Sequence, residues 1–245
     1  MTPTWITAFL DLAPADHPRA LDFWQRVTGH ALSPTRGEHD EFVSLVPPDG
    51  DVQVKIQRLG SGPTRVHLDL HVAAIAPVVE HAVGVGATLV ADHGYAVLAS
   101  PGGFPFCLVT HPASVRATPA TWPGGHRSAL DQVCLDVPPD LWDAEVAFWS
   151  SVTGWPTRSG GPDFVSLVRP PHVPVRILLQ RLEDPQPSVT GHLDRSATAR
   201  PAETARHVAL GAEVLAVHEW WTVLRPPAGP PYCITDRDPE TGVLP

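Results

Sequence analysis

Histidine and aspartate alternate at two places in the chain. His67 and Asp69 are two residues apart, and the same His-Leu-Asp sequence returns at His192. Side chains at i and i+2 share one face of a β-strand, so imidazole and carboxylate are expected to lie together. With Lys55, the pair of His67 and Asp69 offers the groups that a metal-free enzyme uses for general acid–base catalysis. The alternative is a polar pair hydrogen-bonded at a sheet edge, and the sequence leaves both open.

Lys55 is the single lysine of the chain. It alternates with apolar neighbours and is predicted on the polar face of a strand, between Gln53 and Gln57. A lysine enclosed by protein loses solvation, which lowers its pKa and suits it to act as a base or an anchor for an anion. The alternative is a solvated lysine at a sheet edge.

An internal duplication organises the whole chain. The segment at 23–29, FWQRVTG, returns at 148–154 as FWSSVTG, and the matched segments keep their order with an offset of 122 to 126 residues. The repeat is too long for a solenoid unit and indicates a duplicated domain. We predict two domains, 1–112 and 126–245. They are joined by a linker at 113–125 that is rich in Pro, Ala, Thr and Gly.

Hydrophobic periodicity places the polar residues on strands. Trp5–Leu12 alternates as a strand with one core face, and Ala20–Thr28 has the spacing of an amphipathic helix that ends at Gly29. In the first half, further strands are predicted at 42–46, 52–59, 66–72, 87–90, 95–98 and 104–109, with a second helix at 77–85. The pattern strand, helix, three strands therefore occurs twice in each half, and the second half repeats it from Leu130.

These motifs resemble the vicinal-oxygen-chelate superfamily, which includes glyoxalase I, extradiol dioxygenases and bleomycin-resistance proteins. The most similar type is the glyoxalase-like domain. The segments that carry the resemblance are LDFWQRVTG, VKIQRL and RVHLDLHV in the first half and VAFWSSVTGW, ILLQRL and GHLDRS in the second. The resemblance implies an α+β fold of four βαβββ units forming two glyoxalase-like domains. Each domain would be a curled mixed β-sheet cup with helices outside. Because this fold hosts many reactions, function must be argued from the site.

The resemblance also implies where a metal would bind. Metal-dependent members take His or Gln, His, and Glu from the first and last strands of each unit. The matching positions are Thr7, Gln57, His67 and Pro105 in the first half and Gln132, Gln180, His192 and Pro231 in the second. Proline has no side-chain donor, so the glutamate is missing from both halves. An imidazole with neutral amides holds a divalent cation poorly, because hard cations prefer carboxylate oxygens.

We therefore expect no tightly bound catalytic metal and no cofactor. The sequence leaves open a weakly bound divalent metal on His67 with Gln57, or on Gln132, Gln180 and His192. Asp69 or Asp11 could substitute for the missing carboxylate, because alternation puts them on the faces of His67 and Thr7.

The polar faces of the strands are expected to line the two cups and to contact a ligand. The candidate ligand-binding residues are Thr7, Phe9, Gln57, His67, Gln132, Gln180, His192, Trp220 and Trp221. Trp220 and Trp221 suit a planar or apolar ligand, although packing between the halves is the alternative. Cys107 and Cys233 are predicted as small buried hydrophobic residues, because the sequence indicates no base that would activate them.

Composition excludes several functional classes. The formal net charge of −9 and the lack of a basic stripe argue against nucleic-acid binding. No apolar run approaches the roughly 20 residues of a membrane-spanning helix, and the N-terminus lacks a signal-peptide pattern. Three cysteines are too few, and odd in number, for a disulfide framework, which favours a reducing cytoplasm.

The sequence therefore predicts a protein that binds a small aromatic or apolar molecule, as in antibiotic sequestration. The alternative is an enzyme of the superfamily, a lyase, isomerase or dioxygenase acting on a small metabolite with or without a metal. Duplication also allows one half to be functional and the other structural. We expect a monomer of two pseudo-symmetric halves or a homodimer.

Overall fold

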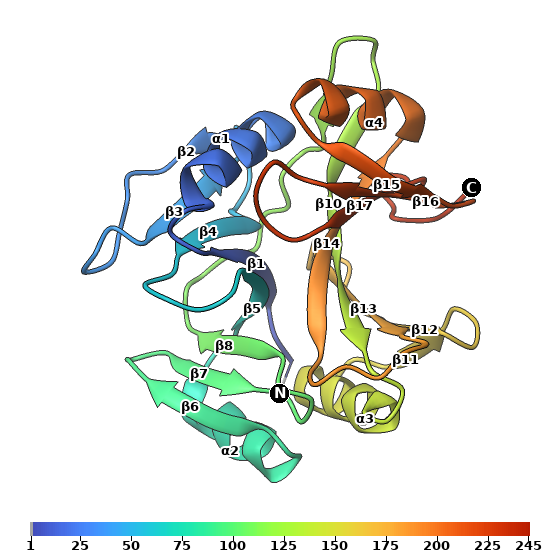
Figure 1. Ribbon diagram of the computed structural model, residues 1–245. Coiled ribbons are helices and arrows are strands. Elements are labelled where there is room, and N and C mark those ends of the chain that lie inside the picture. Colours follow the sequence, from blue (N-terminus) through green and yellow to red (C-terminus); the bar gives the residue numbers. More distant parts are fainter. Residues whose placement is uncertain (1) are drawn as a thin grey trace. The chain divides into compact units, whose positions relative to one another are not determined.

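The computed structural model describes residues 2–245 and confirms an α+β fold with βαβββ units (Figure 1). The elements of the first half are β1 (Trp5–Leu12), α1 (His17–Thr28), β2 (Ala31–Leu32), β3 (Phe42–Val46), β4 (Val54–Arg58), β5 (Arg65–His71), α2 (Ile75–Gly84), β6 (Thr88–Asp92), β7 (Ala96–Ala99) and β8 (Pro105–Val109). Those of the second half are β9 (Ala120–Thr121), β10 (Arg127–Val137), α3 (Trp142–Thr153), β11 (Thr157–Ser159), β12 (Phe164–Leu167), β13 (Arg176–Arg181), β14 (Thr190–Ala197), α4 (Arg200–Ala209), β15 (Glu213–Val217), β16 (Trp221–Arg225) and β17 (Tyr232–Thr235). Among residues 2–245, no helix combines the length and apolar character needed to cross a membrane.

The strands form two mixed sheets that do not close into barrels. The first has the order β2-β3-β4-β1-β5-β8-β7-β6, and the second has the equivalent order β11-β12-β13-β10-β14-β17-β16-β15. In each sheet a parallel pair, β5 with β8 or β14 with β17, joins the start and end of a βαβββ unit. Parallel pairing needs a long crossover, and α2 and α4 provide it.

Most element boundaries agree with the sequence prediction to within a few residues. Helix α1 begins at His17 rather than Ala20, because Pro18 fits the first turn of a helix although it adds nothing to the apolar period. Gly29 ends this helix in the left-handed conformation, with φ 72°. The predicted linker is not wholly irregular, since β9 lies within it and pairs with β10.

The chain forms two compact units that do not follow the order of the sequence. One contains the segments ending at Ala8, Val66–Ser114 and Val133–Gly191, and the other contains Phe9–Arg65, Val115–Gln132 and the segment from His192 onward. Each is described by itself below, as the first unit and the second unit. The domain boundaries and the oligomeric state suggested by the sequence stay predictions.

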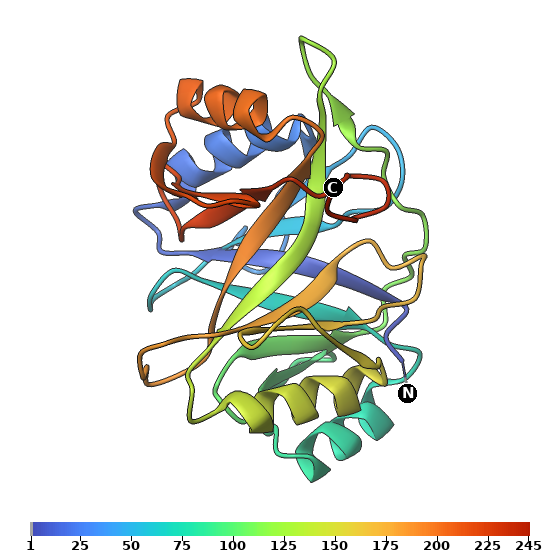
Figure 2. The same ribbon diagram turned by 90° about the vertical axis from the view of Figure 1, so that its right-hand side faces the viewer.

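In the first unit, aromatic side chains of α3 pack on β8. Phe106 contacts both Phe148 and Trp149, with ring centroids 5.9 and 5.3 Å apart. Helix α2 lies beside α3, and His81 is 3.1 Å from the hydroxyl of Ser151 (Figure 2). Because neighbouring residues of a strand point to opposite faces, Cys107 lies on the face of β8 turned away from α3.

The second unit repeats this arrangement with α1 and α4. Tyr232 of β17 packs against Trp24 of α1, 5.1 Å between ring centroids, and bonds to His207 of α4 at 2.8 Å. Arg206 of α4 donates to the main-chain carbonyl of Val27 at 2.8 Å, so α1 and α4 lie side by side. By the same alternation, Cys233 lies on the face of β17 turned away from these helices.

A buried glutamate anchors a helix in each unit. Glu145 of α3 accepts hydrogen bonds from the main-chain N–H of Gly102 and the indole N–H of Trp149. Burial raises the pKa of Glu145 above its usual value. Glu203 of α4 is instead surrounded by Ser128, His126, Arg195, Arg206 and His207. Burial opposes its ionisation, but hydrogen bonds from Arg206 and His207 outweigh burial and hold the pKa of Glu203 well below its usual range.

Candidate ligand and metal sites

The first unit gathers His67, Asp69 and Cys107 on the face turned away from the helices. In the parallel pairing of β5 with β8, Asp69 stands opposite Cys107. Nε2 of His67 is 3.6 Å from Oδ1 of Asp69, and the donor atoms of all three residues lie within 4.8 Å of one another. The predicted His–Asp pair therefore exists, and a cysteine that the sequence analysis assigned to the core completes it.

Thr7 and His71 occupy the neighbouring positions of this face. Nδ1 of His71 lies 2.7 Å from the main-chain carbonyl of His111, and a carbonyl can only accept, so Nδ1 carries the proton. In the neutral ring, Nε2 then accepts the hydroxyl hydrogen of Thr7 at 2.9 Å. The hydroxyl of Thr7, a predicted ligand contact, is thus bonded to protein.

The second unit contains the repeat of the same cluster. Asp194 stands opposite Cys233 in the parallel pairing of β14 with β17, and Nε2 of His192 is 3.3 Å from Oδ1 of Asp194. Gln132 donates a hydrogen bond from Nε2 to Oδ2 of Asp194 at 2.5 Å. Gln132 and His192, both predicted to contact a ligand, therefore each contact the carboxylate of Asp194. Asp194 was not among the predicted ligand-binding residues.

The two cysteines are buried, as predicted, but they are not surrounded only by apolar groups. The thiol of Cys233 lies beside His192 and Asp194, and the donor atoms of the three residues are within 4.8 Å of one another. Burial, and then the charge of Asp194, raises the pKa of Cys233 to about 11. At neutral pH Cys233 is consequently a thiol rather than a nucleophilic thiolate.

A second group of predicted residues meets on β1, β3 and β4 of the second unit. Nζ of Lys55 lies 5.1 Å from the centre of the Phe9 ring, and Phe9 packs edge-on against Phe42 at 6.3 Å. Gln57 stands opposite Phe42, and Lys55 stands opposite Ser44. We call Phe9, Phe42, Lys55 and Gln57 the Lys55 patch. It combines aromatic rings, one cation and one amide, and Lys55, Gln57 and Phe42 are each partly exposed.

Other predicted contacts are engaged elsewhere. The thiol of Cys134 donates to Oε1 of Gln180 at 3.7 Å, in the first unit. Asp11, considered as a substitute metal ligand, forms an ion pair with Arg65 at 3.1 Å. Lys55 belongs to the second unit while His67 and Asp69 belong to the first, so their grouping as one catalytic set stays a prediction.

Trp220 and Trp221 have different surroundings, because β16 begins at Trp221. Trp220 precedes the strand and is 37% exposed. Trp221 pairs with Thr235 and therefore shares the face of Cys233, while its ring stacks on His218 at 4.6 Å. His192 lies four residues and two strands away from the position of Trp221, which is roughly 16 Å at ordinary strand spacings.

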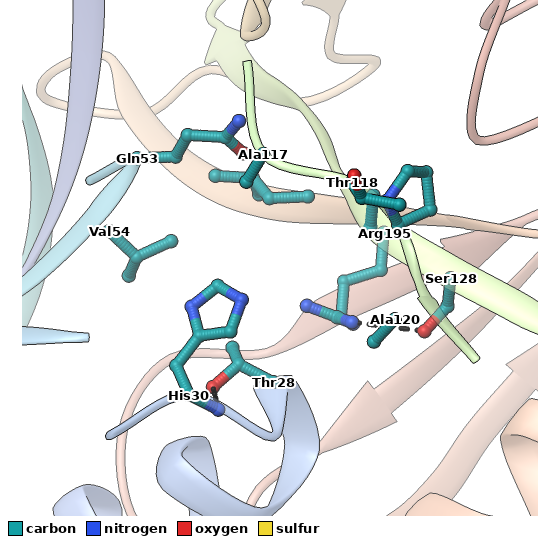
Figure 3. Close-up of a pocket in the computed structure, with 12 residues that line it drawn as sticks. Thr28, His30, Gln53, Val54, Ala117, Thr118, Ala120, Ser128 and Arg195 are labelled. Carbon is teal, nitrogen blue, oxygen red and sulfur yellow. Dashed lines mark hydrogen bonds between the residues drawn. The ribbon is translucent and has the colours of Figure 1, made fainter. Parts of the chain in front are cut away.

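A small cavity in the second unit lies between His30 and Arg195 (Figure 3). Thr28, Gln53 and Ser128 also line it. Burial, and then the charge of Arg195, lowers the pKa of His30 to about 4, and burial lowers the pKa of Arg195 to about 10. The cavity volume of about 20 Å³ accommodates about one water molecule. An organic ligand is therefore not assigned to it.

The metal site of the superfamily does not fit this chain. Pro105 and Pro231, which occupy the glutamate positions, carry no side-chain donor. The other polar positions are engaged, because Thr7 is bonded to His71 and Gln132 to Asp194. The expectation that neither half binds a catalytic metal tightly was drawn from these inherited positions, and it stays a prediction. That expectation did not take the cysteines into account. The sequence signal for them is that Cys107 and Cys233 recur at equivalent positions, each after a His–Asp pair.

Comparison with known proteins gives the following. A family model described as "Glyoxalase-like domain" matches residues 7–109 and 132–235. A variant of 4-hydroxymandelate synthase from Streptomyces coelicolor has a TM-score of 0.66 at 15% identity, over 99% of this chain and 96% of that one. The Mn(II)-bound glyoxalase from Novosphingobium aromaticivorans has a TM-score of 0.64 at 16% identity, over 96% and 82% of the two chains.

A further similar structure is 2,2',3-trihydroxybiphenyl 1,2-dioxygenase from Sphingomonas wittichii strain RW1. Its TM-score is 0.64 at 16% identity, over 94% of this chain and 88% of that chain. No curated protein sequence matches this chain. At such identities the solved structures support the fold and leave the reaction open.

Proposed function

The chain belongs to the glyoxalase-like domain family as a tandem member of the vicinal-oxygen-chelate superfamily, and from this premise we propose that it binds a small aromatic molecule that carries an anionic group. The Lys55 patch carries the proposal. Lys55 lies over the Phe9 ring, and Phe42 and Gln57 flank it. Aromatic walls with a few polar groups are typical of sites for planar ligands.

Each residue of the patch has a distinct part in this proposal. The rings of Phe9 and Phe42 supply apolar area, which favours an aromatic ring in general. Lys55 provides a point charge that pairs with a carboxylate or phenolate. Gln57 adds a donor and an acceptor that fix the orientation of the bound group.

Isothermal titration calorimetry with benzoate and benzyl alcohol tests this assignment. The two probes share a ring, but only benzoate carries a charge, so benzoate is expected to bind more tightly. Lys55→Met should weaken benzoate binding at least about tenfold, or about 1.4 kcal/mol, with little change for benzyl alcohol.

The duplicated half supplies a matched control. Ser166 stands opposite Leu178 just as Ser44 stands opposite Lys55, so position 178 is the repeat of position 55. Leu178→Met introduces the same side chain there and should leave benzoate affinity unchanged. Phe42→Ala should weaken both probes. Absence of binding by the unaltered protein, or equal loss from both methionine variants, would refute the proposal.

An enzyme of the superfamily is the second candidate function. The 3.6 Å approach of His67 to Asp69, and its repeat at His192 and Asp194, support general acid–base chemistry. Product analysis after incubation with a bound aromatic acid tests it. If product forms, and replacing both His67 and Asp69 by Ala leaves the rate unchanged, the acid–base role of this pair is wrong.

A further inference from the structure

His192, Asp194 and Cys233 present three different metal donors at one point of the second unit. Their donor atoms lie within 4.8 Å of one another on the paired strands β14 and β17. Tetrahedral zinc with bonds of about 2.1 Å to nitrogen and oxygen separates those ligands by about 3.4 Å. The distance between His192 Nε2 and Asp194 Oδ1 is 3.3 Å, which matches this spacing without rearrangement.

One oxygen of Asp194 lacks a hydrogen bond although the residue is almost fully buried. Asp194 is only 4% exposed, and Oδ1 accepts no hydrogen bond among residues 2–245. Its other oxygen accepts from Gln132, which fixes the plane of the carboxylate. An unsatisfied buried carboxylate oxygen is costly, and a bound cation removes that cost.

We propose that His192, Asp194 and Cys233 form a zinc site in the second unit, with Gln132 as the positioning residue for Asp194. Imidazole with thiolate favours zinc over magnesium, calcium or manganese, which prefer oxygen ligands. Three protein ligands leave the fourth position of a tetrahedral ion for water or a ligand atom. The His192 side chain is 17% exposed, so solvent reaches the edge of this cluster.

The proposed ligand set differs from that of the superfamily. Both ligand sets include the histidine position, His192. The superfamily's glutamate position is Pro231 in this chain, and the proposed set uses Cys233, two residues later in β17, instead. It also includes Asp194 from β14. The site is separate from the Lys55 patch and does not depend on the function proposed there. Zinc binding releases the thiol proton of Cys233 to solvent, because Cys233 is a thiol in the metal-free protein and zinc binds the thiolate.

The first unit contains the matching residues in a different setting. His67, Asp69 and Cys107 also converge, but the position equivalent to Gln132 is Thr7, whose hydroxyl bonds to His71. The His67 side chain is 8% exposed, about half the value for His192. We therefore assign the zinc site to the second unit and use the first as its internal control.

Titration of the chelator-treated full chain with Co²⁺, a spectroscopic substitute for Zn²⁺, tests the assignment. The unaltered protein should show a thiolate-to-cobalt charge-transfer band that saturates and disappears when Zn²⁺ is added. Excess Mg²⁺ should not displace it. Cys233→Ala should abolish the band, whereas Cys107→Ala should retain it. Circular dichroism of the metal-free proteins verifies that both variants are folded.

Two further variants keep the test decisive if Cys233→Ala does not fold. Asp194→Asn should weaken Zn²⁺ affinity, and Gln132→Leu should weaken it about 10–100-fold, as removal of a hydrogen-bond partner of a metal ligand usually does. Wild-type affinity in Gln132→Leu contradicts the positioning role. A missing charge-transfer band in the unaltered protein, or a band that survives Cys233→Ala, overturns the zinc site.

Discussion

The His–Asp–Cys clusters of the two units have the same residues and different surroundings. In the second unit the amide of Gln132 binds Asp194, and the imidazole of His192 reaches solvent. In the first unit Thr7 stands in place of that amide and bonds to His71 instead. Duplication has therefore preserved side chains at equivalent strand positions, while the neighbours that set their chemistry have diverged.

The two buried glutamates, one on a helix of each unit, also have different neighbours, and their pKa values are shifted in opposite directions. Glu145 accepts hydrogen bonds mainly from neutral groups, and burial raises its pKa. Glu203 lies among two arginines and two histidines, and hydrogen bonds from Arg206 and His207 with the charge of Arg195 hold its pKa low. A buried carboxylate is stabilised by opposite charge in one unit and tolerated as a hydrogen-bond acceptor in the other.

The largest expected effect is in the charged network of the second unit. Glu203→Ala leaves the fully buried guanidinium of Arg195 without its carboxylate and should lower the free energy of unfolding by about 3–5 kcal/mol. Urea denaturation at neutral pH measures this loss. A loss below about 1 kcal/mol would mean that the network does not need the charge of Glu203.

Acidification should also destabilise the second unit through His30. Its pKa is lowered from 6.5 to about 4, so the unfolded state binds the proton first as the pH falls. Stability is therefore lost between pH 6.5 and 4, by about 3 kcal/mol for this group. Denaturation of the unaltered protein and His30→Gln across this range measures the difference. Parallel pH profiles for the two proteins would contradict the assignment.

In the first unit, the approach of α3 to the β7–β8 turn depends on Gly102. A Cβ there would lie 2.5 Å from Val189 and 3.0 Å from the Glu145 carboxylate. Gly102→Ala should cost about 1–3 kcal/mol by overpacking. Gly84, at the exposed end of α2, has nothing within 4 Å of the same position. Gly84→Ala is the matched control and should be neutral or slightly stabilising in thermal denaturation.

The smallest expected effect is that of removing the charge of Glu145. Its pKa is raised from 4.5, so the unfolded state loses the proton first as the pH rises, and stability falls between pH 4.5 and the raised pKa; Glu145→Gln removes this cost. The amide oxygen can still accept from Gly102, whereas the indole N–H of Trp149 then faces the amide NH2 and loses its acceptor. The two effects partly cancel, so the free energy of unfolding at neutral pH should fall by only about 1 kcal/mol. A loss as large as that of Glu203→Ala would erase the contrast between the two glutamates.

Local patterns predicted most of the fold. Alternation located β1 and β3 with their observed bounds, and Gly29 marked the end of α1. The two-residue strand β2 was missed because so short a segment has no measurable period. β9 was missed because its strand pairing, rather than its composition, defines it.

The candidate sites were predictable only in part. Phe9, Lys55 and Gln57 were chosen separately, and the structure brings them together with Phe42. Trp220 and Trp221 were chosen as an aromatic pair of which a strand directs one side chain into the cup; β16 begins at Trp221, so only Trp221 lies within the strand. A cysteine follows the His–Asp pair in both halves of the chain, and this recurrence could have indicated that the cysteine belongs to the site. Considered one at a time, each cysteine lies on an apolar strand and resembles an ordinary core residue.

By itself the sequence determined the duplication, the order of helices and strands, and which side chains share a strand face. These depend on repeat spacing and on local periods of 2 and 3.6 residues. Only the tertiary structure decided that Asp194 stands opposite Cys233, and that Gln132 rather than Thr7 supports the neighbouring carboxylate. Register between strands that are distant in the sequence is specified by burial of one sheet face in the folded protein, and no turn or other local pattern identifies the partner strand.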